Sequence, residues 1–521
     1  MTMTRRRLLQ TGILAATGVP AAPALVRAAP LAWRRDPFSL GVASGEPRPD
    51  GFVLWTRLDP EPMLNERLPQ GDLPVGYEIA ADPALRRLVR RGTARAESAF
   101  GHSVHLAVQG LQPGRPYWYR FTSGAASSRI GRAITAPAAD ADVDRLRLGF
   151  VSCANYEHGF FAAYRHLADE RPDLVLYLGD YIYEESETKL DLPRRHQHRA
   201  VLQTLADYRS RYAEHRIDPD LQRLHAEAAA LLTWDDHEVA NDYAGDVSPK
   251  EGDPEKFRRR RAAAYQAFYE FMPVSPLRSR PHGAEMRLYD RFAWGRLAQI
   301  HMIDGRQYRS PLPCYDPPDH GKGERISDAA CPERLRAGRT YLGAAQERWL
   351  FDSLAASPAR WNLLGQNVLM AEFRARDPAG IVRWDDDWNG WPAARARLLR
   401  HMQAVRVANP VVLGGDNHAF WANRLQLDFD DEQSPTVASE FVGTSVSTWG
   451  SHNEEWDANL PLNPHVLLRD GSQRGYAVAD VTRARMETRF RTISDAKDAH
   501  ATVSTLKTYV VEDGRPGPVE G

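Results

Sequence analysis

The chain has 521 residues and a formal net charge of −1, and 43% of its residues are hydrophobic and 26% charged. This length is too great for one compact domain, and the composition is typical of globular proteins. Because the charges balance, the sequence gives no reason to expect specific binding to nucleic acid or to an anionic membrane surface.

The N-terminus has the pattern of an export signal. The segment Arg5 to Leu9 contains three arginines followed by two leucines, an apolar stretch continues to Val26, and Ala28 ends a small-residue cleavage pattern. We therefore predict a twin-arginine signal peptide over 1–28, with the twin-arginine translocase as a partner during export and a periplasmic or secreted location. The alternative is a membrane anchor, but this stretch is rich in Ala, Gly and Pro. Since no later stretch approaches the ~20 apolar residues of a membrane span, we expect no span after signal removal.

The pattern of residues 37–136 predicts an all-β domain. Its strand-like stretches alternate with turn signals and lie at 52–57, 75–79, 104–108 and 117–121. The turn Leu111-Gln-Pro-Gly114 before Tyr117 is similar to the tyrosine corner of immunoglobulin-like sandwiches. We predict a small immunoglobulin/fibronectin-like sandwich here, followed by an Ala/Asp/Pro linker.

Beyond the linker, strand-like stretches alternate with helical patterns, which predicts an α/β domain over 145–495. The expected helices lie at 160–170, 205–225, 255–271, 344–356 and 391–407. The segment 311–339 lacks periodicity, and we expect a long loop near the functional site.

Six of the strand-like stretches end in residue types that bind metals. They end at Cys153, Asp180, Asp235 to His237, Asp304, Asn367 and Asp416 to His418. The carboxyl ends of strands in an open α/β sheet meet at one crevice, where ligands bind. We interpret these residues as parts of a shared polynuclear metal site.

Asp180 and Tyr183, which follow the same strand, suggest which ions bind. The carboxylate of Asp180 could bridge two metal ions ~3.5–4 Å apart, as in two-metal hydrolysis. A phenolate from Tyr183 would imply a strongly Lewis-acidic trivalent ion, because the tyrosine pKa of ~10 must fall far. The alternative for Tyr183 is a residue of the hydrophobic core.

Two further clusters are dense in ligand types. In Trp234-Asp-Asp-His-Glu238, one aspartate could bind a metal while His237 faces the substrate as a proton donor. The other interpretation is a helix start capped by Asp235 or Asp236. In Gly414-Gly-Asp-Asn-His418, Asp416 and His418 could both reach the site, or they could be solvated residues of a glycine-rich turn.

The chain has three cysteines. Cys314 and Cys331 lie in one loop, and in an oxidising compartment we expect them to form a disulfide; two free thiols are the alternative. Cys153 is then left over at a strand end, either as a metal-binding thiolate or as a small buried residue.

Taken together, these motifs resemble those of PhoD-like alkaline phosphatases, within the calcineurin-like metallophosphoesterase superfamily. The resemblance covers essentially the whole mature chain. It rests on the segments 40–57, 152–155, 179–184, 234–238, 304–309, 414–418 and 440–444. It implies an α/β fold, with a metallophosphatase core of two β-sheets flanked by helices after the β-sandwich.

The resemblance also implies a centre with one ferric ion (Fe³⁺) and calcium (Ca²⁺). By position, the ferric ligands would be Cys153, Asp180, Tyr183 and His418, with Asp180 bridging to calcium and Asp236 and Asp416 completing that side. The weaker ligand candidates are Asn155, Asn241, Asp242 and Asn367, of which we place Asn367 with the metal ligands. We place His237, Arg306 and Asn241 in the catalytic group. His237 would be the general acid or a phosphate contact, and Arg306 and Arg309 would neutralise phosphate or brace their loop. Gly305 departs from the family, which has Thr or Asp there.

The implied function is an exported metal-dependent phosphatase that hydrolyses phosphomonoesters and phosphodiesters, acting on phosphate-ester small molecules or phospholipid head groups. One alternative is a phospholipase D-type phosphodiesterase. Another is a non-catalytic surface protein that binds phosphate or metal. Loops at 185–200, 311–339 and 445–465 are expected to decide the choice of substrate.

Overall fold

The computed structural model describes residues 32–62, 68–189, 191–316, 322–378, 380–450 and 453–521. The predicted signal peptide lies outside the described residues. Among the helices of the described residues, none combines the length and the apolar character that crossing a membrane requires.

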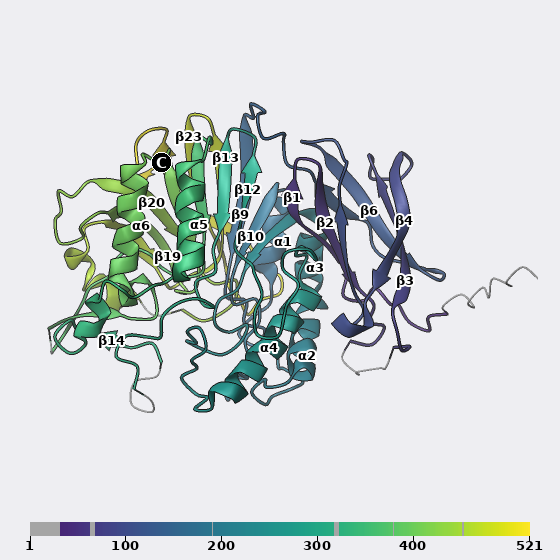
Figure 1. Ribbon diagram of the computed structural model, residues 1–521, viewed down its shortest axis with the longest axis horizontal. Helices are drawn as coiled ribbons and strands as arrows, with labels where there is room; N and C mark the ends of the chain where they lie inside the picture. The colour runs from purple at the N-terminus through teal and green to yellow at the C-terminus, as the bar shows by residue number, and fades with distance from the viewer. Residues whose placement is uncertain (1–31, 63–67, 190, 317–321, 379, 451–452) are drawn as a thin grey trace, which may run out of the picture.

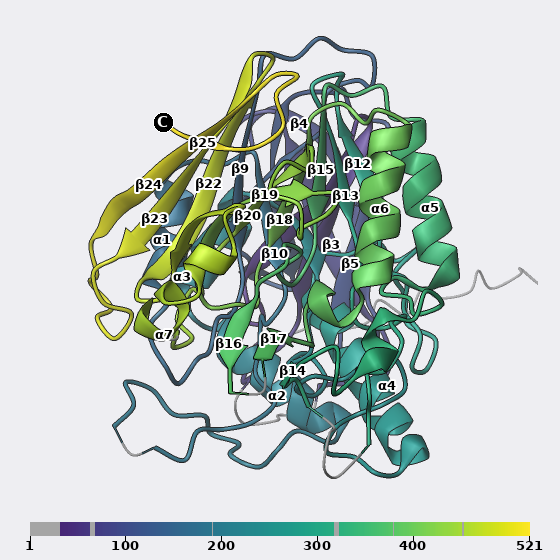
Figure 2. The same cartoon turned by 90° about the vertical axis from the view of Figure 1, so that its left-hand side faces the viewer.

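Two large β-sheets lie face to face in the middle of the molecule (Figures 1 and 2). Among the described residues, the first has ten strands in the order β25 (Val519–Glu520), β24 (Val503–Glu512), β23 (Arg485–Ile493), β22 (Arg474–Thr482), β9 (Arg145–Val151), β10 (Leu174–Leu178), β11 (Ala229–Thr233), β1 (Val42–Arg48), β2 (Gly51–Arg57) and β5 (Ser103–Val108). The second has seven, in the order β12 (Asp290–Trp294), β13 (Ala298–Met302), β15 (Trp361–Gly365), β18 (Pro410–Gly414), β20 (Thr436–Val442), β19 (Phe420–Gln426) and β21 (Val466–Asp470). Strands β9, β10, β11 and β1 run parallel to one another, as do β13, β15, β18 and β20.

The apolar core between the sheets is built from alternate residues of their strands. Phe150 and Leu176 of the first sheet belong to the same buried cluster as Leu363 and Leu413 of the second. Along each strand, the residues that alternate with these core residues point outward, toward the helices that cover both sheets. This arrangement explains the continuously apolar strands, because parallel strands covered on both faces lose the alternation of polar and apolar residues. The predicted α/β core of two sheets flanked by helices is confirmed.

Helices pack against the outer faces of both sheets (Figure 2). The first sheet is covered by α1 (Ala162–Asp169), α2 (Leu205–Arg216), α3 (Pro219–Glu227) and α4 (Pro254–Phe271), and the second by α5 (Gly343–Ala355) and α6 (Pro392–Ala404). The single helix expected over 205–225 is two helices. Asp218 caps the second of them, with its side chain accepting from two backbone N–H groups, and Pro219 occupies its first turn, where a missing N–H costs nothing.

The N-terminal segment forms the predicted sandwich. One layer is β1, β2 and β5, and the other contains β4 (Leu88–Ala96), β3 (Leu73–Ala80), β6 (Pro116–Ser123), β7 (Ala126–Ser127) and β8 (Gly131–Ile134). The Tyr117 hydroxyl donates to the Gln112 carbonyl at 3.3 Å and accepts from the Gln112 N–H at 3.0 Å, which is the contact of a tyrosine corner. Because β1 also pairs with β11, with Ser44 opposite Ala229, the first layer continues into the core sheet.

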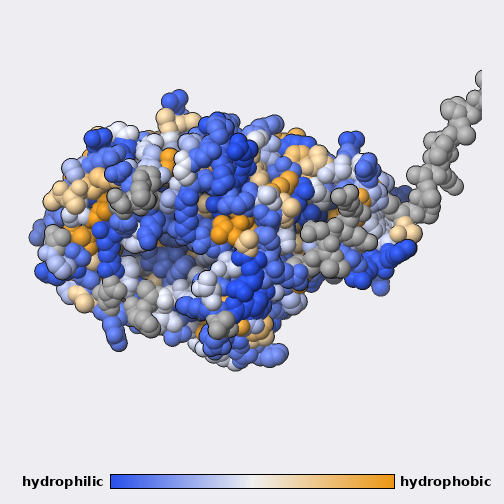
Figure 3. Space-filling model, turned by 90° about the horizontal axis from the view of Figure 1, so that it is seen from below, coloured by the Kyte–Doolittle hydropathy of each residue, from blue (hydrophilic) through white to orange (hydrophobic). Residues whose placement is uncertain are grey.

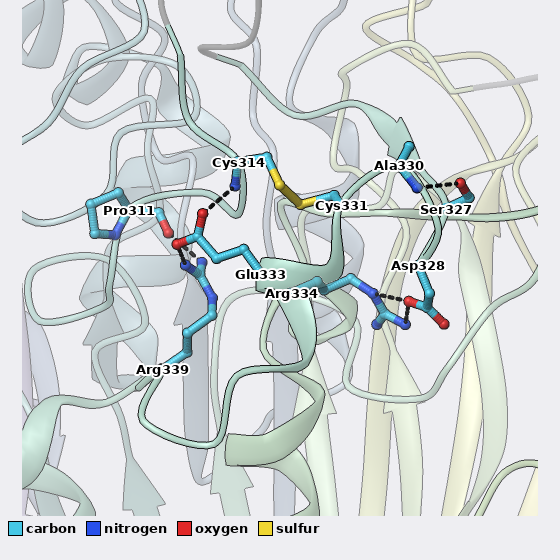
Figure 4. The surroundings of a disulfide bond; sticks show 9 residues. All are labelled: Pro311, Cys314, Ser327, Asp328, Ala330, Cys331, Glu333, Arg334 and Arg339. Carbon is cyan, nitrogen blue, oxygen red and sulfur yellow. Dashed lines mark hydrogen bonds and ion pairs between the residues drawn. A yellow bond between two sulfur atoms is a disulfide. The ribbon is translucent and has the colours of Figure 1, made fainter.

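A disulfide closes the long loop at 311–339, as expected for Cys314 and Cys331. Figure 4 shows how side chains near Cys331 hold both ends of the loop. The Glu333 carboxylate accepts from the Cys314 N–H at 3.1 Å and pairs with Arg339 at 3.0 Å, and Arg334 pairs with Asp328. The loop also contains β14 (Arg325–Ile326), which forms a small sheet with β17 (Gly380–Trp384) and β16 (Ala375–Asp377).

Removal of this disulfide by Cys314→Ser with Cys331→Ser is expected to lower the free energy of unfolding by about 3 kcal/mol, because the bond limits the conformations of the unfolded chain. The two cysteines are 17 positions apart in the sequence. Thermal unfolding of the oxidised protein, the reduced protein and the double variant measures the effect, with reduced wild type expected to match the variant. Equal melting temperatures for all three would contradict the prediction.

Candidate metal centre

The strand ends predicted from the sequence do meet in space, but they come from two sheets. Cys153, Asp180 and Asp236 follow β9, β10 and β11 of the first sheet, while Asn367 and Asp416 follow β15 and β18 of the second. The single open sheet expected from the motifs is therefore replaced by the meeting point of two sheets. Asp304, after β13, lies beside them and accepts hydrogen bonds from the Arg306 and Gln307 N–H groups.

The chain turns sharply at these strand ends. Five site residues have a backbone in the left-handed region, namely Cys153 (φ 59°), Asp180 (φ 52°), Asp242 (φ 57°), Asp416 (φ 60°) and His418 (φ 52°). Such conformations cost energy for residues other than glycine and occur often at functional sites. Gly179 makes one of the turns possible, because a Cβ on it would lie 2.4 Å from the Cβ of Asp235.

One group of ligand atoms contains Cys153, Asp180 and His418, which lie within 4.8 Å of one another. The Tyr183 hydroxyl joins this group, since it donates to Asp180 Oδ2 at 3.1 Å and lies 3.4 Å from His418 Nε2. The hydroxyl of Thr448 donates to the Tyr183 oxygen at 2.8 Å. The structure thus brings together the four side chains that the resemblance implies as ferric ligands.

A second group contains Asp180 again, together with Asp235, Asp236 and Asp416. Asp180 is therefore common to both groups. The interpretation of Asp235 or Asp236 as a helix cap is wrong, because no helix begins there and residues 237–239 form a turn. Instead, the Asp236 carboxylate accepts from the His237 N–H at 2.9 Å and from the Asp242 N–H at 2.6 Å.

Burial of so many acidic groups is unfavourable unless a cation lies nearby. Burial raises the pKa of Asp180, Asp416, Cys153 and Tyr183 well above their ordinary values, and the neighbouring carboxylates add to the effect. Among the described residues, Asp180 Oδ1 is buried without a hydrogen-bond partner. A metal ion in contact with these atoms would hold them ionised, so the donor set fits one.

Arg306 lies behind the carboxylates. It is fully buried, and its guanidinium donates to Asp235 and, at 2.8 and 3.0 Å, to both carboxylate oxygens of Asp386. Arg309 also pairs with Asp386. This geometry favours the bracing role for both arginines over direct contact with phosphate.

Asn367 supports Asp235 from the second sheet. Its Nδ2 donates to Asp235, and its Oδ1 is buried without a hydrogen-bond partner among the described residues. A Cβ on Gly305 would lie 2.3 Å from that Oδ1. The departure from the family at Gly305 thus leaves room for Asn367.

His237 is held by a carboxylate that the motifs did not single out. Its Nδ1 lies 2.6 Å from Glu184 Oε2, and its ring lies 4.3 Å from the Tyr183 ring. Burial opposes a positive charge, but Glu184, Asp236 and Asp180 outweigh it and raise the pKa of His237 well above its ordinary value. The Asn241 N–H donates to the other Glu184 oxygen at 2.7 Å. Glu184 therefore fixes the orientation of the His237 ring, and the surrounding carboxylates favour its protonated form.

Glu238 was also missed as a functional residue. Its buried carboxylate accepts from the backbone N–H groups of Asp180, Tyr181 and Asp235, at 3.1, 2.6 and 2.8 Å. These bonds hold the turn after β10 against the turn after β11. In the sequence, the only sign of this role is the position of Glu238 directly after His237.

These residues open into a cavity of about 530 Å³. Its lining contains the site residues Asp236, His237, Asn241, Asp242, Asp386, Asp416 and His418, and also Lys322, Gly323, Arg325, Trp384, Asn417 and Trp456. Figure 3 shows a hollow on the lower face of the molecule, bordered mainly by hydrophilic residues. Asp236, Asp242 and Asp386 form a further group of ligand atoms there. The volume is sufficient for a small organic molecule.

The chain is similar to known proteins over most of its length. A family model described as PhoD-like phosphatase matches residues 148–490, and one described as the N-terminal domain of PhoD-like phosphatases matches residues 24–137. Alkaline phosphatase D of Bacillus subtilis (strain 168) is 40% identical over 488 residues, which are 92% of this chain and 82% of that protein. A solved structure of PhoD matches with a TM-score of 0.88 at 39% identity, over 94% of this chain and 93% of that chain. The similarity therefore includes both the sandwich and the two-sheet core.

Proposed function

The chain belongs to the PhoD-like phosphatase family, and on that basis we propose that it is an exported phosphatase that hydrolyses phosphomonoesters and phosphodiesters with a ferric-calcium centre. The observation that carries this proposal is the position of Asp180. Its carboxylate lies in one buried group with Cys153 and His418, and in another with Asp236 and Asp416. A carboxylate shared in this way suits a bridge between two metal ions.

The two groups offer donors that suit different ions. One side combines the thiol of Cys153, the phenol of Tyr183 and the imidazole of His418. A bound metal would ionise the thiol and the phenol, and two such anionic ligands favour a trivalent ion such as ferric iron. On the other side, Asp236 and Asp416 offer oxygen ligands, which suit calcium. When bound, the ions would supply Lewis acidity to activate water and positive charge to stabilise the phosphate.

The protein's own groups would position and protonate the substrate. Because Glu184 occupies Nδ1 of His237, the free Nε2 can donate to a phosphate oxygen or to the departing alcohol. Tyr183 packs against the imidazole ring, and the Asn241 N–H holds the Glu184 carboxylate. Arg306 keeps Asp235 and Asp386 in place from behind.

The size of the cavity supports a broad class of substrates. At about 530 Å³ it has room for an organic alcohol in addition to one phosphate, and also for a diester. Phosphate-ester small molecules and phospholipid head groups both fall within this class. The Cys314–Cys331 disulfide supports export, because such bonds persist in oxidising compartments.

The ferric assignment is tested by metal analysis and visible absorption of the purified protein. Wild type is expected to contain iron and calcium and to show a charge-transfer band. Tyr183→Phe should remove or shift that band and lower the iron content together with activity. The matched control is Tyr181→Phe, since the Tyr181 hydroxyl contacts His225 Nε2 at 3.0 Å instead of the site. Zinc or manganese alone, without a visible band, would contradict the ferric assignment, as would full iron and an unchanged band in Tyr183→Phe.

A further inference from the structure

The lining of the cavity carries positive charge as well as carboxylates. Lys322 and Arg325 line the cavity together with Asp236, Asp242 and Asp416. If the phosphate that reacts is held at the metal-binding carboxylates, the remainder of the substrate occupies the same cavity as these cations. They would therefore interact with the alcohol that leaves.

Lys322 is exposed, and among the described residues it forms neither an ion pair nor a hydrogen bond. Its backbone is nevertheless fixed relative to the metal centre. The N–H of the next residue, Gly323, donates to Asp242 Oδ2 at 3.0 Å. A Cβ on Gly323 would lie 2.7 Å from Trp384 Cζ2, so the chain is packed closely against that ring. The side chain of Lys322 thus extends from a fixed backbone, and its ammonium group is available to a ligand.

Arg325 is held in the lining of the cavity by different contacts. It lies opposite Trp384 in the pairing of β14 with β17, and its guanidinium carbon lies 5.6 Å from the centre of the Trp456 ring. The disulfide between Cys314 and Cys331 closes the loop that carries both cations. The segment that carries Lys322 and Arg325 is therefore held in place beside the site.

We propose that Lys322 and Arg325 form a subsite for a second phosphate, so that the preferred substrates are phosphate esters whose alcohol carries another phosphate group. The inference rests on the proposed phosphatase function and names a substrate class for it. A cation paired with phosphate across a cleft contributes to selectivity through charge-assisted hydrogen bonds. A neutral alcohol makes no such contact.

The test compares two substrates that differ only in the second phosphate, propane-1,3-diol bisphosphate and propane-1,3-diol monophosphate. Initial rates of phosphate release give kcat/KM for each, corrected for the two equivalent phosphates of the first. Wild type is expected to prefer the bisphosphate by about fivefold to tenfold. Lys322→Ala should lower this ratio about fivefold, and Lys322→Glu should bring it below one, because like charges repel. The preference should also fall as ionic strength rises.

The control is Lys256→Ala, since Lys256 is an exposed lysine on α4 that pairs with Glu251. It should leave the ratio as in wild type. A ratio near one in wild type, or an equal ratio in wild type and Lys322→Glu, would overturn the subsite while leaving the phosphatase function intact. If neither substrate were hydrolysed by the metal-loaded enzyme, nor any other phosphate ester, the proposed function and the subsite would fail together.

Discussion

Asp180→Asn is expected to remove both kinds of metal ion and to lower kcat/KM for a phosphate ester at least about a thousandfold. The carboxylate of Asp180 is the one group shared by the thiol-containing and the all-carboxylate clusters, and its Oδ1 is free of hydrogen bonds among the described residues. An amide has nearly the same shape but no charge, so it cannot hold two cations together. The loss should therefore exceed that from Asp236→Asn, which affects only one side.

The measurement is the iron and calcium content of each variant alongside its kinetics. Asp144→Asn serves as the control, because the side chain of Asp144 is 98% exposed in the linker. Circular dichroism checks that the variants are folded. If Asp180→Asn kept both ions and most of its activity, a bridging role for Asp180 would be excluded. If it lost only iron, Asp180 would belong to one side of the centre.

The strand ends of the site could be predicted because each joins a short apolar stretch to an abrupt polar residue. Leu174 to Leu178 is apolar at every position since both faces of its sheet are covered, and Gly179 marks its end. The spacing of Asp180 and Tyr183 also sufficed to place both side chains at one point. Local sequence carries this information, because the turn and the ligand lie next to each other.

The partners of these residues could not be predicted, because they come from distant parts of the chain. Glu184 is 53 residues away from His237, and Asp386 is 80 residues away from Arg306. The role of Arg306 depends on its burial behind Asp235, which only the packing of the two sheets decides. Nothing in the local sequence distinguishes a phosphate-binding arginine from a bracing one.

Long-range pairing also explains what the sequence did not reveal about the fold. The Ala/Asp/Pro linker suggested a separate sandwich, yet β1 pairs with β11 and joins the sandwich to the core sheet. Residues such as Cys153 and His418 give no sign of a left-handed backbone, because that conformation is ordinarily associated with glycine. These features determine where the metal-binding residues lie. The sequence therefore predicts which residues they are better than it predicts their arrangement in space.

His237→Ala is expected to lower kcat about a hundredfold to ten-thousandfold while both metals stay bound. Glu184 fixes the Nδ1 side of the ring and, with Asp236 and Asp180, favours its protonated form. The variant would thus remove a proton donor and a positive charge from the cavity without removing a carboxylate ligand. The exposed His500 supplies the matched control, His500→Ala, which should behave as wild type.

The two roles open to His237 predict different dependences on the leaving group. If His237 protonates the departing alcohol, His237→Ala should impair hydrolysis of an alkyl phosphate far more than that of p-nitrophenyl phosphate, because nitrophenolate leaves without a proton. If His237 only stabilises charge on the phosphate, both substrates should slow by the same factor. Glu184→Gln should produce a smaller defect of the same kind, because the imidazole would keep its place but lose the carboxylate that favours its charge. Unchanged turnover in His237→Ala would exclude both roles, and a loss of metal from that variant would instead make His237 a ligand.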